Sequence, residues 1–191
     1  MFTGIIEHVG TIAAKRDDGL SAEAPGLAQR LSVGGSIAVA GVCLTATRIA
    51  GDIVDVDVVP ETFARTTLAR CVVGTPVNLE LPATPSTFLA GHIVQGHVDG
   101  VGEVREVTEE GNSVRITLAP ERELMRYVVE KGSVAVDGVS LTVAGVSDDA
   151  FMVAVIPHTR TATTLGLLQA GGRVNIETDV LAKYAEKLIL H

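Results

Sequence analysis

The sequence predicts an all-β protein built from two tandem domains of one fold, followed by a C-terminal α-helix. Segments 35–81 and 132–178 align without a gap and share about twenty identities, which indicates an internal duplication. Each half contains short runs rich in Val, Ile and Thr, separated by Gly, Asp and Pro, a pattern typical of strands joined by turns. About six such runs in each half of roughly 85 residues favour a small closed barrel or a sandwich.

The duplication is clearest in the hexapeptide GVCLTA, which recurs in the second half as GVSLTV. One copy carries Cys43 where the other carries Ser140, and VDVVPET aligns with VAVIPHT in the same frame. A looser match places FTGIIEHVGTI, starting at Phe2, over VQGHVDGVGEV, starting at Val94. The two domains are therefore expected to share one fold and to differ in chemistry.

The elements follow in order along the chain. Segment 53–59 (IVDVDVV) alternates cleanly, and Pro60 ends it because proline has no N–H for the strand ladder. Segment 121–130 (ERELMRYVVE) carries apolar residues on one stripe and predicts a short helix. In the first half, strands are expected at 36–39, 45–49, 53–59 and 77–81, with counterparts in the second half.

The segment around 82–92 contains two prolines and is predicted to link the halves. We place the N-terminal domain at 1–88, the C-terminal domain at 89–178 and the last helix at 179–191. That helix has no counterpart in the first half. Its apolar stripe is expected to contact a partner subunit, because a barrel offers it no place to be buried. The stripe consists of Leu181, Tyr184, Ala185 and Leu188.

Composition excludes several classes of function. The net charge of −8 and the isoelectric point near 5.1 argue against nucleic acid and anionic membranes as partners. The first residues, MFTGIIE, do not resemble a signal peptide, and no run approaches the roughly 18 apolar residues of a membrane helix. We expect a cytoplasmic protein with free thiols at Cys43 and Cys71. Without a CxxC or HExxH motif, no metal site is expected.

Equivalent positions of duplicated domains can face one another, which makes the pair Cys43 and Ser140 a candidate site. The alternative interpretation is equally ordinary, since Cys is often a small buried apolar residue and Ser often stabilises a turn. His92 and His97 in GHIVQGH would point to opposite faces of a strand, which disfavours a shared metal. A structural role is the simpler reading of both, although His97 could act as a general acid.

Four further residues have competing interpretations. His158 stands where the first repeat has Glu61, so the halves offer different groups at one place. Asp179 directly precedes the last helix and could be its N-cap. Lys131 and Asp137 lie near a Gly turn, where a solvated charge is the default expectation.

The motifs MFTGIIE, GVCLTA, GHIVQGHVDG, EKGSVAVDGVSLTV, VIPHT and VNIETDVLAKY together resemble the riboflavin synthase alpha-chain family over essentially the whole chain. The resemblance implies two six-stranded Greek-key barrels plus a C-terminal helix, assembled as a homotrimer. It implies dismutation of two molecules of 6,7-dimethyl-8-ribityllumazine to riboflavin and 5-amino-6-(ribitylamino)uracil, without a metal or redox cofactor. Lumazine synthase is a further partner that the resemblance suggests.

The resemblance also implies an active site between the N-terminal barrel of one subunit and the C-terminal barrel of its neighbour. The family's catalytic positions correspond to Phe2, Ser36, Cys43, His97, Ser140 and Asp179, with His97 and Ser140 as proton shuttles. The N-barrel pocket would be lined by Gly4, Ile5, Ile6, Cys43, Leu44, Thr45, Asp57, Val58, Val59, Pro60, Glu61 and Thr62. The C-barrel pocket would be lined by Gly96, His97, Val98, Ser140, Leu141, Thr142, Ile156, Pro157, His158, Thr159, Arg160 and Thr161, with Lys131 from another chain.

Three departures and two alternatives accompany this prediction. Segment 81–83 (LPA) stands where many family members have a basic stretch, and Ala90 stands where they have Gly. Ala40 stands where many family members have Asn, and it aligns with Asp137. We therefore expect the N-barrel to bind the substrate ring less tightly, because a lost polar contact costs on the order of 1–3 kcal/mol. The alternative functions are a non-catalytic lumazine- or flavin-binding protein and a paralogue that acts on a modified lumazine.

Overall fold

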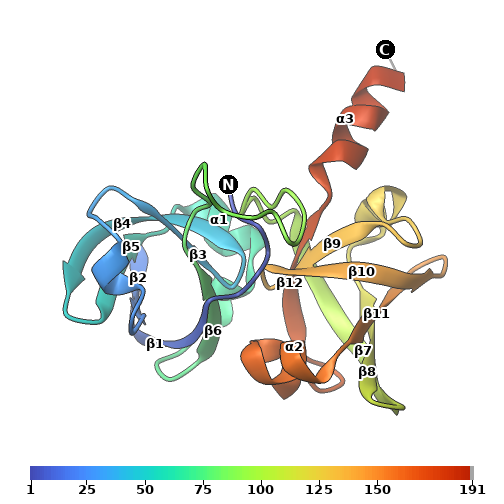
Figure 1. The fold of residues 1–191 in the computed structure, drawn as a ribbon, viewed down its shortest axis with the longest axis horizontal. Helices are drawn as coiled ribbons and strands as arrows, with labels where there is room; N and C mark the ends of the chain where they lie inside the picture. The colour runs from blue at the N-terminus through green and yellow to red at the C-terminus, as the bar shows by residue number, and fades with distance from the viewer. Residues whose placement is uncertain (190–191) are drawn as a thin grey trace.

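The computed structural model describes residues 1–189 as two barrels side by side, with the last helix extending away from the second barrel (Figure 1). The first barrel contains β1 (His8–Arg16), β2 (Gly19–Glu23), β3 (Ser36–Val39), β4 (Val42–Ala50), β5 (Ile53–Asp57) and β6 (Pro76–Glu80). The second contains β7 (Gly100–Glu110), β8 (Ser113–Ala119), β9 (Ser133–Val136), β10 (Val139–Val146), β11 (Phe151–Val155) and β12 (Arg173–Thr178).

Both barrels have the same antiparallel topology. The first closes in the order β1-β2-β5-β4-β3-β6, and the second follows the same order when its strands are numbered from β7. Alternate residues of each strand point inward, as the pattern of buried and exposed side chains along β11 shows. Each barrel thereby encloses an apolar core of its own. The predicted fold class of two six-stranded barrels plus a helix is confirmed.

The predicted elements differ from the structure mainly at their ends. Pro60 follows β5 as expected, but it also begins the short helix α1 (Pro60–Arg65), because proline suits the first position of a helix. Pro157 begins the equivalent helix α2 (Pro157–Ala162) in the second barrel. The helix expected at 121–130 is a shorter 3₁₀ segment, η3 (Arg122–Tyr127). GHIVQGH lies outside the strands and makes only an isolated bridge at Val94.

Contacts between the barrels follow an approximate two-fold axis. Phe2 and Val94, which the repeat alignment made equivalent, exchange two backbone hydrogen bonds of 2.7 and 3.2 Å. Asn78 Nδ2 donates to the carbonyl of Asp137, and Asn175 Nδ2 donates to the carbonyl of Ala40. These paired contacts hold the two barrels in one fixed arrangement, since each polar group is buried and satisfied by the other barrel.

The helix α3 (Val180–Ile189) begins at the predicted N-cap. The amide of Leu181 donates to Asp179 Oδ1 over 2.9 Å, which satisfies one of the free N–H groups of the first turn. The predicted helix continued to His191, and residues 190–191 lie outside the part that the structure describes.

The polar side of α3 faces its own chain. Lys183 Nζ lies 2.6 Å from Asp99 Oδ1, and Tyr127 donates its hydroxyl proton to Glu186. The predicted apolar stripe points away from both barrels: Leu181 and Tyr184 are 62% exposed and Leu188 is 80% exposed. A stripe of this kind has no partner within the described part of the chain.

Both cysteines are free, as the sequence predicted. None of the helices in residues 1–189 has the length and apolar character needed to span a membrane.

Candidate active site

Each barrel carries a pocket at the equivalent place, beside the repeated GVCLTA or GVSLTV strand. The first, called here the Cys43 pocket, has a volume of about 370 Å³ and is lined by Val42, Cys43, Glu61, Thr62, Arg65, Thr66, Gly96, His97, Val98 and Asp99. The second, the Ser140 pocket, is smaller at about 100 Å³ and is lined by Gly4, Ile5, Ile6, Val139, Ser140, His158, Thr159, Ala162 and Thr163.

The segment leading into each barrel crosses over and completes the pocket of the other barrel. Cys43 N donates to the carbonyl of Gly96 over 2.9 Å, and Ser140 N donates to the carbonyl of Gly4 over 2.8 Å. The sequence prediction placed residues 4–6 with Cys43 and residues 96–98 with Ser140, and this grouping is wrong. The grouping came from the family resemblance, position by position. In the structure each segment packs on the other barrel before its own first strand begins.

Glycine is required at both crossings. Gly4 and Gly96 have φ values of +76° and +79°, in the left-handed region that side chains disfavour. A Cβ at Gly4 would lie 2.6 Å from the Cβ of Ser140, and a Cβ at Gly96 would lie 2.5 Å from the Cβ of Cys43. The backbone therefore touches both candidate groups directly, and any side chain would push the segment out of its pocket.

Two buried glutamates hold the crossing segments. Glu80 accepts hydrogen bonds from the amide and hydroxyl of Thr3 and from the amide of Gly4. Glu177 accepts the amides of Gln95 and Gly96 over 2.6 and 2.9 Å. Burial raises the pKa of both carboxyl groups, and the donated hydrogen bonds oppose that rise. The same device thus sets the position of both segments.

Ser140 has a partner that the sequence did not indicate. Its hydroxyl lies 2.7 Å from His92 Nδ1, and His92 is 9% exposed, with burial lowering its pKa. His92 Nε2 is buried without a hydrogen-bond partner among the described residues. The sequence prediction gave His92 a structural role and paired His97 with Ser140, but His97 lines the Cys43 pocket instead.

The two pockets offer different groups at equivalent positions. The first combines the Cys43 thiol, which is half buried, with Glu61 and His97. In the second, these positions are occupied by Ser140, His158 and Ile5. The Cys43 pocket therefore has a histidine, His97, on its crossing segment. The Ser140 pocket has His158 on α2 instead, and its hydroxyl is hydrogen-bonded to His92, which lies outside the lining.

Several predicted residues lie elsewhere. Phe2 is fully buried between the barrels against Ala38, Val94 and Ala135, where Cys43 packs on it. Leu44 and Leu141 belong to the barrel cores. The remaining predicted residues, Ser36, Thr45, Asp57, Val58, Val59, Pro60, Lys131, Thr142, Ile156, Pro157, Arg160, Thr161 and Asp179, line neither pocket within this single chain.

The structure also corrects the prediction for Asp137. It was expected to be a solvated charge and to strengthen ligand binding in the C-barrel, but it is 8% exposed and lies between the barrels, as does Ala40. The turns that carry them face the other barrel, so the difference between Asp137 and Ala40 does not distinguish the two pockets. Pocket residues that sequence reasoning missed include Arg65, Thr66, Ala162 and Thr163. Each lies about one helical turn after a predicted pocket residue, namely Glu61, Thr62, His158 or Thr159.

Comparison with known proteins assigns this architecture to a family. The family model of the lumazine binding domain matches the chain twice, at residues 3–82 and 95–179. A crystal structure of LumP complexed with riboflavin has the same fold, with a TM-score of 0.86 and 28% identity over 93% of this chain and 99% of that one. A second structure, of LumP with 6,7-dimethyl-8-(1′-D-ribityl) lumazine, gives a TM-score of 0.84 over the same coverage.

Two matched barrels with equivalent pockets define a protein of the lumazine-binding class. Riboflavin synthase of Mycobacterium bovis is 44% identical over 199 residues, covering 99% of this chain and 98% of the relative. Riboflavin synthase of Actinobacillus pleuropneumoniae is 43% identical over 194 residues, covering 100% and 90%. The chain belongs to the riboflavin synthase family, and it is an enzyme.

Proposed function

We propose that this chain catalyses the dismutation of two molecules of 6,7-dimethyl-8-ribityllumazine. One molecule donates a four-carbon unit to the other, and the products are riboflavin and 5-amino-6-(ribitylamino)uracil. The observation that carries this proposal is a pair of equivalent pockets with different chemical groups. A reaction that joins two copies of one molecule in opposite roles needs two related sites that are not identical.

The identity pattern supports an enzyme rather than a binding protein. Riboflavin synthases match at 38 to 44% over nearly the whole chain, whereas LumP matches at 28 to 30%. A non-catalytic lumazine-binding protein is the second candidate, because solved structures of the same fold include LumP complexes with riboflavin and a lumazine.

The Ser140 pocket is proposed to move protons. The lumazine C7 methyl group is acidic, because its anion delocalises into the ring, so a base in the site can remove a proton from it. His92 suits the role of proton acceptor: burial lowers its pKa and so favours the neutral imidazole, and its Nδ1 lies 2.7 Å from the Ser140 hydroxyl. Ser140 is then the group that exchanges a proton with the substrate. His92 holds the Ser140 hydroxyl in position and relays the proton.

The Cys43 pocket is proposed to hold the second lumazine. The Cys43 thiol, the imidazole of His97 and water are the groups available to add transiently to C7 of this molecule. Most of the acceleration would come from holding the two rings in stacked contact, since correct placement of two reactants contributes more than any single proton transfer.

The complete active site is proposed to lie between two chains of a homotrimer in the cytoplasm. The exposed stripe on α3 supports the assembly, because burying Leu181, Tyr184 and Leu188 contributes roughly 1.5–3 kcal/mol for each side chain. The site is proposed to need no metal or redox cofactor. Contact with lumazine synthase stays a prediction.

One assay separates the two candidate functions. Purified protein is mixed with 6,7-dimethyl-8-ribityllumazine, and the absorbance of riboflavin is followed over time. We expect catalytic formation of one riboflavin for every two lumazines consumed. Saturable binding of the lumazine without riboflavin formation would identify a binding protein instead.

A further inference from the structure

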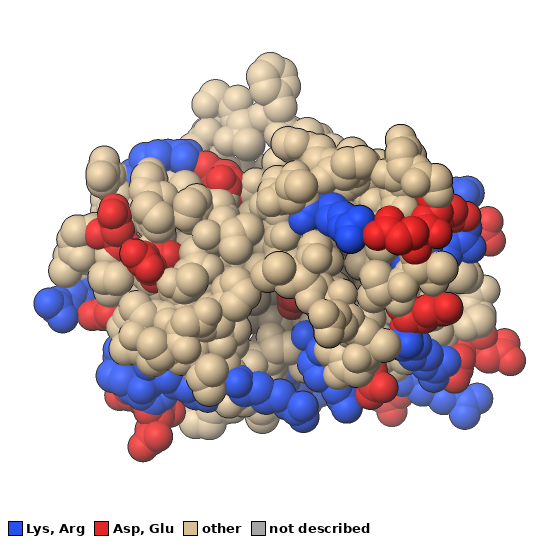
Figure 2. Space-filling view, turned by 90° about the horizontal axis from the view of Figure 1, so that it is seen from below, with Lys and Arg blue, Asp and Glu red and all other residues tan. Residues whose placement is uncertain are grey.

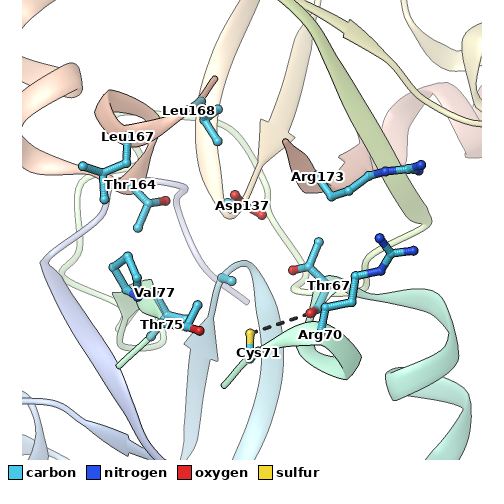
Figure 3. Close-up of a pocket in the computed structure, with 12 residues that line it drawn as sticks. Thr67, Arg70, Cys71, Thr75, Val77, Asp137, Thr164, Leu167, Leu168 and Arg173 are labelled. Atoms are coloured by element: carbon cyan, nitrogen blue, oxygen red, sulfur yellow. Dashed lines mark hydrogen bonds between the residues drawn. The ribbon is translucent and has the colours of Figure 1, made fainter. Parts of the chain in front are cut away.

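A third cavity, of about 250 Å³, opens between the two barrels (Figure 3). None of its lining residues belongs to the Cys43 pocket or the Ser140 pocket. Figure 2 shows the molecule hollowed between its two halves, with acidic atoms inside the hollow and basic side chains at its edge. The walls are largely apolar and include Val77, Leu167 and Leu168 (Figure 3).

The cavity lies where equivalent parts of the two repeats meet, yet its two sides differ. Thr67 in the first repeat corresponds to Thr164 in the second, and both line the cavity. Ala40 corresponds to Asp137, so a methyl group on one side faces a carboxyl group on the other. This difference places a carboxyl group on one side of the cavity only.

Asp137 has an unused hydrogen-bonding atom in this cavity. Its side chain is more than nine-tenths buried, and its Oδ1 accepts the amide of Asn175 over 2.7 Å. Its Oδ2 accepts no hydrogen bond from any described residue, and Figure 3 shows the carboxyl group at the centre of the cavity. Burial raises the pKa of Asp137 to about 7. Oδ2 keeps contact with the open space of the cavity, so it is free to accept a hydrogen bond from a molecule bound there.

Two arginines, one from each barrel, lie at the edge of the cavity. The side chains of Arg70 and Arg173 extend towards the same side of it (Figure 3). Arg173 pairs with Glu103 at 3.2 Å, whereas Arg70 makes no ion pair or hydrogen bond through its side chain within residues 1–189. Neighbouring guanidinium groups are suited to bind a carboxylate or phosphate.

We propose that the inter-barrel cavity binds a small aromatic acid that carries a hydrogen-bond donor. The ring would lie between the apolar walls, an N–H or O–H group would donate to Asp137 Oδ2, and the acidic group would bind Arg70 and Arg173. The size is suitable, because a cavity of roughly 150 Å³ holds benzene and this one leaves room for substituents at both ends. The site is separate from the proposed reaction, so the lumazine assay and the test below can fail independently.

The test uses three probes on the full chain. 4-(Aminomethyl)benzoate has both a donor and an acidic group, benzoate lacks the donor, and benzylamine lacks the acidic group. Isothermal titration measures the affinities, and amide chemical shifts in NMR spectra report the place of binding. We expect 4-(aminomethyl)benzoate to bind at least roughly tenfold more tightly than either other probe, with shifts at Ala40, Cys71 and Leu168.

Matched variants identify the contacts. Asp137→Asn keeps the acceptor for Asn175 and tolerates the positive φ of 45°, but it replaces Oδ2 by an NH₂ group. We expect Asp137→Asn to weaken the binding of 4-(aminomethyl)benzoate about tenfold and to leave the affinity for benzoate unchanged. Arg70→Gln should weaken the binding of both acids. Asp52→Asn, in an exposed turn, is the control.

Three results would overturn the proposal: no saturation at millimolar concentration, equal affinity for wild type and Asp137→Asn, or shifts confined to residues around Cys43 and Ser140.

Discussion

The Cys43 pocket and the Ser140 pocket share a backbone and differ in chemistry. Both lie beside the same repeated strand, both are completed by a crossing glycine, and both crossings are held by a buried glutamate. Only the Ser140 pocket places a buried imidazole on its hydroxyl. The duplication therefore preserved the way each pocket is built, while the groups that can exchange protons diverged. The predictions below test this difference.

The largest effect is expected at the pair of Ser140 and His92. Ser140→Ala and His92→Gln should each lower kcat by roughly 10²–10⁴-fold with little change in riboflavin affinity, because both act on proton transfer. The double variant should be hardly worse than either single one, since the two residues act as a unit. Steady-state kinetics measure the rates. His8→Gln, in β1, is the control. If the rate loss of the double variant equals the two single losses combined, the proton relay is contradicted.

Removing the last helix tests the assembly. Deletion of 182–191 should convert the proposed trimer to smaller species, because the contact area of the exposed stripe is lost, and activity should fall with it. Light scattering measures the mass. Leu181→Asp with Leu188→Asp should act in the same direction, whereas Lys187→Ala should have no effect. A trimer that survives the deletion would contradict the role of α3.

Two glycine substitutions should disable the pockets one at a time. Gly4→Ala places a Cβ against Ser140, and Gly96→Ala places one against Cys43. Each variant should lose one class of riboflavin site and retain the other, with tenfold or greater weakening at the affected pocket, about 1.4 kcal/mol or more. Titration by fluorescence quenching measures both classes, and circular dichroism confirms folding. Loss of both classes in either variant would mean that the pockets are not independent.

A different effect concerns the stability of the fold rather than the pockets. It arises at Asp137, whose equivalent in the first repeat, Ala40, has no titratable group. Its folded pKa of about 7 lies above the ordinary value of 3.8, so the folded state binds this proton more tightly. Its contribution to stability is full below about pH 4 and is lost as the pH rises towards 7. Because each pKa unit corresponds to about 1.4 kcal/mol, Asp137→Asn should gain a few kcal/mol relative to wild type between pH 4 and pH 8. Urea unfolding at both pH values measures this, and a difference independent of pH would contradict it.

Much of the fold follows from the sequence because its signals are local. Alternating apolar residues predicted β5, the position beside a Gly turn predicted β3, and an unmatched apolar stripe predicted α3. The family resemblance supplied the closure of the strands into barrels. Asp179 at the helix start was also visible, since capping depends on neighbouring residues.

The crossing of the leading segments was not visible, because an alignment of repeats shows which residues are equivalent but not which barrel each one contacts. The glycines shared at 4 and 96 were a usable signal, since a glycine in both repeats often marks a close backbone approach. His92 and Ser140 are far apart in sequence, and the burial of Asp137 depends on how the barrels pack. Only the three-dimensional arrangement shows this contact and this burial.

The central claim is that two different pockets, contributed by neighbouring chains, form each active site. Mixed trimers of Gly4→Ala and Gly96→Ala test it most directly, after co-expression or refolding in equal amounts. A Ser140 pocket from a Gly96→Ala chain and a Cys43 pocket from a Gly4→Ala chain are both intact. Random mixing should therefore restore activity at about a quarter of the sites in a cyclic trimer, although each variant alone is inactive. Mixed trimers no more active than the separate variants would contradict the account.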